Sequence, residues 1–274
     1  MKINLSKFRQ SPGKKINLAN FNSDAPNGFS KEKSVSLLSN NLAELEELQY
    51  RLFAESNTSL LIVLQGIDTA GKDGTIRNVF SAFNPQGVYV KSFKAPDGLE
   101  TQHDYLWRIH NSCPPRGAIA IFNRGHYEDI FVPRVHKTIT EKAATKRICH
   151  LNEFERLLTD EKTIVIKLFL NISKDEQFER LNSRIVDSTR NWKFSTADVD
   201  ERAHWERYAE VFSETLSKTN TAYAPWWIIP SNQKWFRNLL VSEIVLKSLR
   251  DLKLEWPKSE LSSKEARRAL ESSS

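Results

Sequence analysis

Ser59-Leu-Leu-Ile-Val-Leu-Gln65, followed by Gly66-Ile-Asp-Thr-Ala-Gly-Lys-Asp-Gly74 and Thr75-Ile-Arg-Asn-Val-Phe80, is the segment from which the fold can be predicted. The unbroken apolar run at 60–64 predicts a strand buried on both faces. Apolar side chains then recur at helical spacing within 75–80, so a helix is expected after the glycine-rich turn. A strand, Gly-x4-Gly-Lys and a helix in this order indicate a phosphate-binding P-loop.

The loop between this strand and helix has the chemistry of an anion site. Gly66 and Gly71 allow the backbone to turn and to approach a ligand closely. The amides that follow can converge on phosphate oxygens, and the positive end of the helix adds to the attraction. Lys72 is expected to reach the terminal phosphates. The other expected phosphate-binding positions of the loop are Thr69, Ala70, Gly71, Asp73 and Gly74.

One position departs from the usual P-loop pattern. Asp73 follows Lys72 where such loops carry Ser or Thr, so the hydroxyl that normally contacts magnesium is absent. Thr75 is a poor substitute, whereas a carboxylate at Asp68 beside the phosphates suits a hard cation. The alternative is a glycine-rich turn without a ligand, and the flanking strand and helix argue against it.

Composition places the chain in a broad class. Its 274 residues suit one large α/β domain, or one domain with an appended lid, and 39% hydrophobic residues allow a sizeable core. The net charge of +6 favours an anionic partner, although an ordinary soluble basic surface would give the same value.

Cysteine content and hydropathy narrow the expected location. Cys113 and Cys149 are the only cysteines, which excludes a disulfide framework or a zinc site and favours a reducing cytoplasm. The N-terminal sequence lacks the apolar run of a signal peptide. No apolar stretch is long enough to span a bilayer, so no membrane partner is expected.

The rest of the chain alternates between strands and helices. Strands are predicted at 60–64, 88–93, 117–122, 163–170 and 225–230, and further helices at 34–54, 99–111, 140–158, 173–186, 198–218 and 235–252. Residues 1–33 are polar and predict an extended arm over the domain or a neighbour, and the polar tail 257–274 predicts a frayed end. This alternation predicts an α/β fold, a three-layer αβα sandwich around a five-stranded parallel sheet.

Polar residues gather directly after the third predicted strand, in Asn123-Arg-Gly-His-Tyr-Glu-Asp129. Ligands of open α/β sheets bind at the carboxyl ends of the strands, so this segment is expected beside the P-loop. Arg124 and Arg134 suit bidentate phosphate binding, although a salt bridge from Arg124 to Glu128 or Asp129 is the alternative. Asp68, Glu128 and Asp129 offer carboxylates for magnesium, and a structural role is favoured for His126.

A second group of cations lies near residue 185. It consists of Arg180, Arg184, Arg190 and Lys193. The first two are four residues apart and share a helix face. Such a group indicates either a second polyanion site or a lid that closes over phosphates, with an ordinary solvated face as the alternative.

Six motifs in this order resemble the type-2 polyphosphate kinase family. They are the loop 66–74, Ser92-Phe-Lys-Ala-Pro96, Leu106-Trp-Arg108, Phe122-Asn-Arg-Gly-His-Tyr-Glu-Asp129 with Arg134-Val-His136, Asn191-Trp-Lys-Phe194 with Asp198, and Ala224-Pro-Trp226 with Lys234-Trp235. The resemblance runs from about Ser34 to Leu249. It implies a P-loop kinase domain at 34–256 with a helical lid at about 180–215.

The resemblance also implies an activity. It is the reversible transfer of the terminal phosphoryl group between inorganic polyphosphate and a nucleotide, with Mg²⁺ or alternatively Mn²⁺. The implied catalytic residues are Asp68, Lys72 and Arg124, with Asp68 and Asp129 at the metal. Lys94, Asn123, Glu128, Asp129 and Arg134 join the loop in binding nucleotide and phosphate, and the lid cations bind polyphosphate. A cytoplasmic homodimer or homotetramer is expected, acting on adenine or guanine nucleotides.

The residues that follow Arg124 indicate which nucleotides accept the phosphoryl group. His126-Tyr-Glu-Asp129 resembles the branch of the family that accepts both nucleoside mono- and diphosphates. Asn123 and Gly125 stand where Asp and Ser are usual, yet the core set is intact and activity is expected. The rival hypotheses are an ATP-dependent nucleoside monophosphate kinase and a nucleic-acid binder that uses the basic lid with Trp192 and Phe194. No recognised nucleic-acid motif is present, which argues against the second rival.

Overall fold

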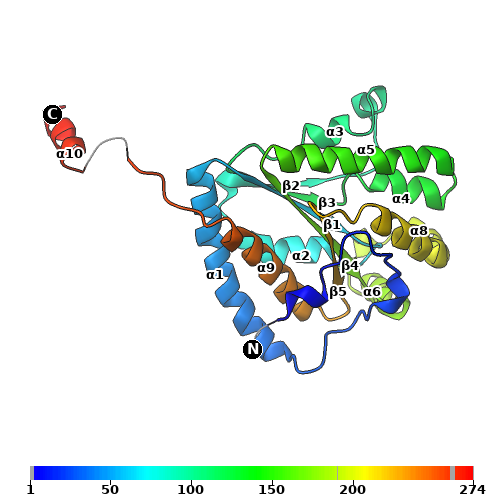
Figure 1. Cartoon of the computed structure of the whole chain (residues 1–274). Helices are drawn as coiled ribbons and strands as arrows, with labels where there is room; N and C mark the ends of the chain where they lie inside the picture. Colours follow the sequence, from blue (N-terminus) through cyan, green and yellow to red (C-terminus); the bar gives the residue numbers. More distant parts are fainter. Residues whose placement is uncertain (1–2, 190, 260–262, 274) are drawn as a thin grey trace.

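The computed structural model describes residues 3–189, 191–259 and 263–273 (Figure 1). In this part of the chain, five parallel strands form one sheet in the order β2-β3-β1-β4-β5. The strands are β1 (Ser59–Gln65), β2 (Val88–Ser92), β3 (Ile119–Asn123), β4 (Thr163–Asn171) and β5 (Trp226–Pro230). The predicted five-stranded parallel sheet is therefore confirmed.

Helices cover both faces of this sheet. The α-helices are α1 (Lys31–Glu55), α2 (Lys72–Val79), α3 (Trp107–His110), α4 (Glu128–Val135), α5 (Glu141–Asp160), α6 (Lys174–Val186), α7 (Thr196–Ala203), α8 (Trp205–Lys218), α9 (Lys234–Asp251) and α10 (Ser263–Ser272). Short 3₁₀ helices are η1 (Leu5–Lys7), η2 (Leu18–Asn20), η3 (Phe80–Ala82), η4 (Pro85–Gly87), η5 (Gly98–Gln102) and η6 (Asn191–Lys193). None of the described helices is both long and apolar enough to cross a membrane.

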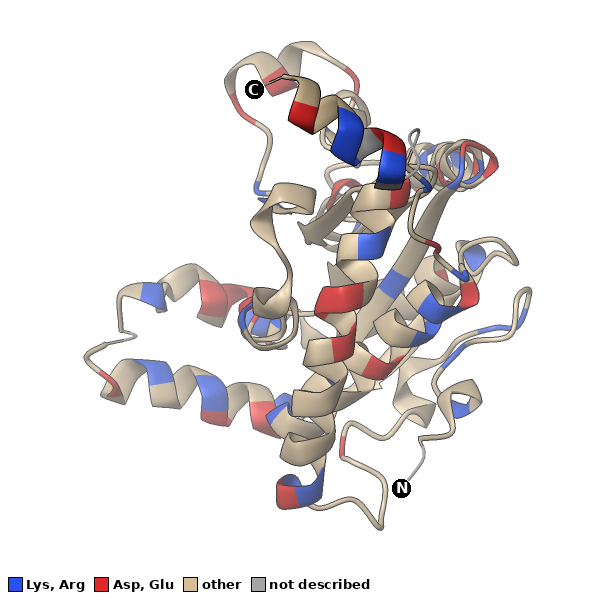
Figure 2. Cartoon of the chain, turned by 90° about the vertical axis from the view of Figure 1, so that its left-hand side faces the viewer, with Lys and Arg blue, Asp and Glu red and all other residues tan. Residues whose placement is uncertain are grey.

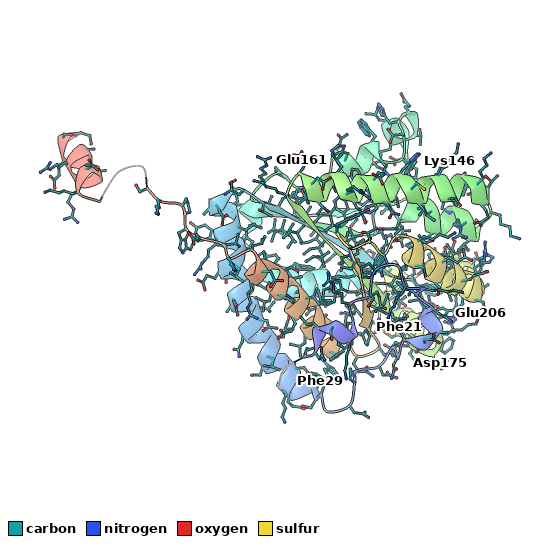
Figure 3. All side chains as sticks on the ribbon, viewed as in Figure 1. Phe21, Phe29, Lys146, Glu161, Asp175 and Glu206 are labelled. Atoms are coloured by element: carbon teal, nitrogen blue, oxygen red, sulfur yellow. The ribbon has the colours of Figure 1, made fainter. Side chains whose placement is uncertain are left out.

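The alternating side chains of β1 divide the core into two layers. Leu60, Ile62 and Leu64 pack into the cluster beneath α1 and α9, and Leu61 and Val63 into the cluster beneath α4, α5 and α8. Every residue of β1 is buried, because parallel strands in the middle of such a sheet are covered on both faces. Figure 3 shows side chains filling the space between the sheet and the helices on either side. The predicted three-layer sandwich is confirmed.

Two predicted helices are each interrupted. The segment 99–111 forms η5 and the short α3 instead of one helix, because the side chain of Asp104 accepts a hydrogen bond from the backbone N–H of Leu106 at 2.9 Å. The segment 198–218 breaks at His204, which separates α7 from α8. In the tail, where a frayed end was expected, residues 263–272 form α10, which stands apart from the sheet in Figure 1.

The N-terminal arm lies along its own domain. The N–H of Gln10 donates to Trp226 O at 2.8 Å, and the N–H of Ile228 donates to Phe8 O at 2.9 Å. These bonds form an isolated antiparallel bridge beside β5, at the outer strand of the sheet. The arm thus covers an edge that would otherwise expose unpaired backbone groups.

A buried charge network lies between β4 and the helices α4 and α5. The Lys167 ammonium donates to Glu155 Oε2 at 2.7 Å and to Thr219 O at 2.6 Å, and both charged side chains are fully buried. Glu155 Oε1 also accepts from the Tyr127 hydroxyl at 2.6 Å and lies 3.0 Å from His126 Nε2. Burial raises the pKa of Glu155, but Lys167 and His126 outweigh it, so the net shift is downward. His126, for which a structural role is predicted, is fully buried in this network.

This network gives a stability prediction. We expect Lys167→Met to lower the free energy of unfolding by about 3–5 kcal/mol, because it leaves the buried Glu155 without its cation. Denaturant melts followed by circular dichroism measure the change. The double variant Lys167→Met with Glu155→Gln is expected to recover part of the loss, since no uncompensated charge remains. A single variant within about 1 kcal/mol of the wild type contradicts the assignment.

Candidate active site

The loop between β1 and α2 has the predicted P-loop conformation at the carboxyl end of β1. Gly66 has φ +147° and Gly71 has φ +107°. A Cβ atom at Gly66 would lie 2.7 Å from Leu170 O, so only glycine fits there. The loop leads directly into α2, whose first residue is Lys72. The free N–H groups of this helix end therefore point toward a site for anions.

Lys72 lies inside this loop. Its Nζ donates to Gly66 O at 2.7 Å and to Ile67 O at 3.3 Å, and only 8% of the residue is exposed. Burial, and next the charge of Arg124, lower the pKa of the Lys72 ammonium. The carboxylates of Asp68, Glu128 and Asp73 act in the opposite direction. The ammonium is thus held among charges of both signs.

Arg124 joins the end of β3 to the loop. Its Nη2 lies 2.5 Å from Asp68 Oδ1 and its Nη1 lies 3.5 Å from Glu128 Oε2. Of the salt bridges considered from the sequence, the one to Glu128 is present. These three side chains line a cavity whose wall is formed by Gly66, Ile67, Asp68, Arg124, Glu128, Phe131, Val132, Gln177, Glu201, Tyr208 and Phe212. The segments after β1 and β3 therefore converge as expected for adjacent strands.

The two acidic residues that begin α4 have different surroundings. Glu128 faces the cavity, and burial raises its pKa against the opposing charges of Arg124 and Lys72. Asp129 instead pairs with Arg108, at 3.1 Å between Asp129 Oδ2 and Arg108 Nη2. Burial raises the pKa of Asp129 as well. The structure thus brings Glu128 to Asp68 and Arg124, and turns Asp129 toward Arg108.

A divalent cation fits this acidic pair. Mg²⁺ is usually held by one or two carboxylates together with phosphate oxygens and water. Asp68 and Glu128 line one cavity beside the phosphate-binding loop, and both already interact with a cation, Arg124. The carboxylates of Asp68 and Glu128 therefore match the donor set expected for a hard cation.

Asp73 ties the loop to two other segments. Its Oδ1 accepts from Asn123 Nδ2 at 2.9 Å, and its Oδ2 lies 3.2 Å from Lys193 Nζ. Burial raises the pKa of this carboxyl, but the hydrogen bonds from Asn123 and Lys193 outweigh it and the net shift is downward. The position that lacks the usual hydroxyl thus connects the loop with the end of β3 and with Lys193, which lies in the predicted lid.

The predicted lid cations have unequal roles in the structure. Arg184 Nη1 lies 3.3 Å from Asp198 Oδ2 on α7, and Lys193 pairs with Asp73. Arg180 is mostly buried and donates to the carbonyl oxygens of Thr69, Ala70, Ser231 and Asn232. Arg180 therefore supports the loop backbone, whereas Arg184 contacts α7 and Lys193 contacts the residue after Lys72. Arg190 lies outside the described residues.

Two further predicted phosphate ligands do not line the cavity formed by Asp68, Arg124 and Glu128. Arg134 is buried between α4, α5 and α8, where its Nη2 lies 2.8 Å from Glu141 Oε2 and 2.6 Å from Glu214 Oε2. Through these two ion pairs, its guanidinium links α4 to α5 and α8. Lys94 has an exposed side chain, and its backbone oxygen accepts from Arg108 Nη1 at 2.8 Å.

Several residues at the site escaped the sequence analysis. Gln177 on α6 donates to Asp68 O at 3.2 Å, and Tyr208 on α8 donates to Glu201 Oε2 at 2.6 Å. Arg237 on α9 lies against the loop at Gly71. All are distant in sequence from the glycine-rich loop, and no local pattern marks them.

Comparison with known proteins places this geometry in a family. A family model described as "Polyphosphate kinase 2" matches residues 28–257. An AMP/ADP-polyphosphate phosphotransferase of Meiothermus ruber is 42% identical over 261 residues, covering 94% of this chain and 98% of that protein. An ADP-polyphosphate phosphotransferase of Rhodopseudomonas palustris is 37% identical, with 94% of each chain covered.

A solved structure agrees with these relatives. The crystal structure of polyphosphate kinase 2 from Arthrobacter aurescens superimposes with a TM-score of 0.94 at 39% identity, covering 100% of this chain and 98% of that one. The match includes the whole described sheet and the loop that follows β1. The chain belongs to the polyphosphate kinase 2 family.

Proposed function

We propose that this protein is a phosphotransferase that moves the terminal phosphoryl group between inorganic polyphosphate and a nucleotide, with both AMP and ADP as acceptors. Guanine nucleotides are the alternative acceptors. The observation that carries the proposal is the convergence of Lys72, Arg124 and the carboxylates of Asp68 and Glu128 at the carboxyl ends of β1 and β3. The relative from Meiothermus ruber, named for both AMP and ADP, supports the broad acceptor range.

The residues divide the work of phosphoryl transfer. Donor and acceptor are both anions, so catalysis consists mainly of positioning them and of stabilising the migrating charge. In our proposal, the loop amides and Lys72 hold the reacting phosphates, Arg124 contacts the migrating group, and Arg184 and Lys193 guide the polyphosphate chain. Asn123 and Asp73 hold the loop in register with β3.

Enzymes of this kind generally use a divalent cation. We propose that Asp68 and Glu128 hold Mg²⁺, or alternatively Mn²⁺, together with phosphate oxygens. When bound, the cation supplies additional neutralisation of phosphate charge. A role for Asp129 at the metal requires its separation from Arg108, so we assign it to orienting the start of α4.

The assembly and partners remain predictions. We propose a cytoplasmic homodimer or homotetramer without a nucleic-acid or membrane partner. Figure 2 shows Lys and Arg interspersed with Asp and Glu on the helices in view, rather than one continuous basic ribbon face. Light scattering of the purified protein tests the oligomeric state.

The reaction itself is tested by nucleotide formation. Purified protein is incubated with magnesium and long-chain polyphosphate, with AMP and ADP offered separately and no ATP. ADP from AMP and ATP from ADP together support the proposal. Product from ADP alone keeps polyphosphate as donor but overturns the broad acceptor range. No product, with activity restored by ATP as donor, indicates a nucleoside monophosphate kinase.

The lid assignment gives a prediction of its own. We expect Arg184→Ala and Lys193→Ala each to raise the KM for polyphosphate about three- to tenfold, because each removes a cation that pairs with phosphate. The effect shrinks as salt is added, since salt screens the same charges. Steady-state rates at several salt concentrations measure it. Lys146→Ala, on the exposed side of α5 (Figure 3), is the control for loss of a surface charge. Wild-type KM in both lid variants contradicts a substrate-binding lid.

A further inference from the structure

Arg237 on α9 is a buried cation with unusual surroundings. The residue is 2% exposed, and its Nε and Nη2 donate to Asn238 Oδ1 at 3.1 and 2.9 Å. Among the described residues, no carboxylate forms a salt bridge with it. Two other buried cations, Arg134 and Lys167, each pair with at least one Glu. A buried charge without a counter-charge is costly, so its retention needs an explanation.

The guanidinium of Arg237 lies directly against the phosphate-binding loop. A Cβ atom built on Gly71 would lie 1.8 Å from Arg237 Nη1, and one built on Gly74 would lie 3.2 Å from Nη2. The guanidinium is therefore in contact with the backbone at the start of α2. This contact also explains why glycine is required at Gly71, where any side chain would displace the arginine.

Neighbouring charges do not balance Arg237 in the absence of a ligand. Burial, and then the positive charge of Arg180, lower the pKa of Arg237 to about 10, so it remains a cation at neutral pH. Arg180 Nη1 would lie 3.5 Å from the same Cβ position at Gly71. Arg180 is itself occupied by Glu176 and by carbonyl oxygens of the loop. Two guanidinium groups thus adjoin one turn of the loop.

We propose that Arg237 is a positioning residue for the bound phosphates, and that its uncompensated charge, acting through the loop at Gly71 and Gly74, is balanced by the phosphate anion that binds there. The proposal rests on the proposed function, in which this loop holds phosphates. Coulomb interactions are weakly screened at a buried site, so a cation that does not touch the ligand still increases its affinity. In the free protein the buried charge of Arg237 is destabilising, and a bound phosphate anion offsets this destabilisation.

The experiment compares Arg237→Met, which removes the charge, with Arg237→Lys, which keeps it. Affinity for tripolyphosphate is measured by calorimetry on the full chain without nucleotide, and stability without ligand is measured by denaturant unfolding. For Arg237→Met we expect affinity to fall about tenfold or more, with stability equal to or above that of the wild type. We expect Arg237→Lys to stay within about threefold of wild-type affinity.

The salt dependence separates this residue from the lid. The loss of affinity in Arg237→Met is expected to persist at high salt, because a buried charge is poorly screened, whereas the losses in Arg184→Ala and Lys193→Ala shrink. If the losses of affinity in all three variants shrink equally as salt is added, the loss in Arg237→Met does not come from a buried charge, and the inference is wrong.

Other outcomes distinguish the failures. One outcome is that Arg237→Met loses stability, as expected for Lys167→Met, or does not fold. If Arg237→Lys also loses tripolyphosphate affinity in proportion to its loss of stability, Arg237 is a structural residue and the inference is wrong. If Arg237→Met binds tripolyphosphate as the wild type does, the inference is wrong while the proposed function stands. If the wild type itself binds no tripolyphosphate, both are overturned.

Discussion

Lys72→Ala is expected to lower kcat at least about 10²-fold, by analogy with the loss of one oriented donor to a developing negative charge. Lys72 is the first residue of α2 and its ammonium is buried in the loop, so the variant removes a positive charge from inside the loop itself. Its present acceptors, Gly66 O and Ile67 O, hold it beside the site that phosphates would occupy. Steady-state rates of ATP formation from ADP and polyphosphate measure the change.

Two variants sharpen this first prediction. Lys72→Arg keeps the charge, but the longer and planar group does not fit the position beside Gly66 O, so we expect little rescue. Lys146→Ala, on the exposed side of α5, removes a remote positive charge and is expected to keep the wild-type rate. Normal turnover of Lys72→Ala would remove Lys72 from the catalytic residues.

Arg124→Ala is expected to lower kcat/KM about 10²- to 10³-fold, again on the scale of a lost donor to the transition state. Arg124 lies at the end of β3 with φ +71°, and two carboxylates hold its guanidinium over the cavity. Arg124→Lys keeps the charge but loses the planar fork that binds phosphate through two hydrogen bonds, so we expect only partial rescue.

The pH profile gives Arg124→Ala a second readout. Burial raises the pKa of Glu128, and Arg124 is the first of the charges that oppose this shift. Without Arg124 the pKa of Glu128 rises further, so this carboxylate takes up its proton at a higher pH. The acid limb of the rate profile is therefore expected to move to higher pH. A variant with lower activity but an unchanged acid limb would show that Arg124 does not act on Glu128.

The loop of this protein shows how a missing hydroxyl is accommodated. Asp73, in the place of the usual Ser or Thr, forms a hydrogen bond with Asn123 and an ion pair with Lys193. The carboxylates of Asp68 and Glu128 are in the cavity instead. The residue after the loop lysine thus connects the loop with Lys193 and with the end of β3.

Local sequence predicted a helix, strand or loop well where all the residues that specify it lie in one short segment. The apolar run of β1, the glycines of the loop and the start of α2 are adjacent in the chain, so pattern and turn chemistry were sufficient. The interruptions at Asp104 and His204 were missed, because helical periodicity on both sides conceals a break that depends on one hydrogen bond or one backbone angle.

The sequence alone determined the fold class, the position of the phosphate-binding loop and the convergence of polar residues after β1 and β3. Only the tertiary structure decided which of two adjacent acids, Glu128 or Asp129, faces the cavity, because neighbouring positions on a helix point in different directions. It also decided that Arg237, far from Gly71 in the sequence, lies against the loop. Such contacts depend on how α9 packs against α2 and the sheet, and no local pattern records that packing.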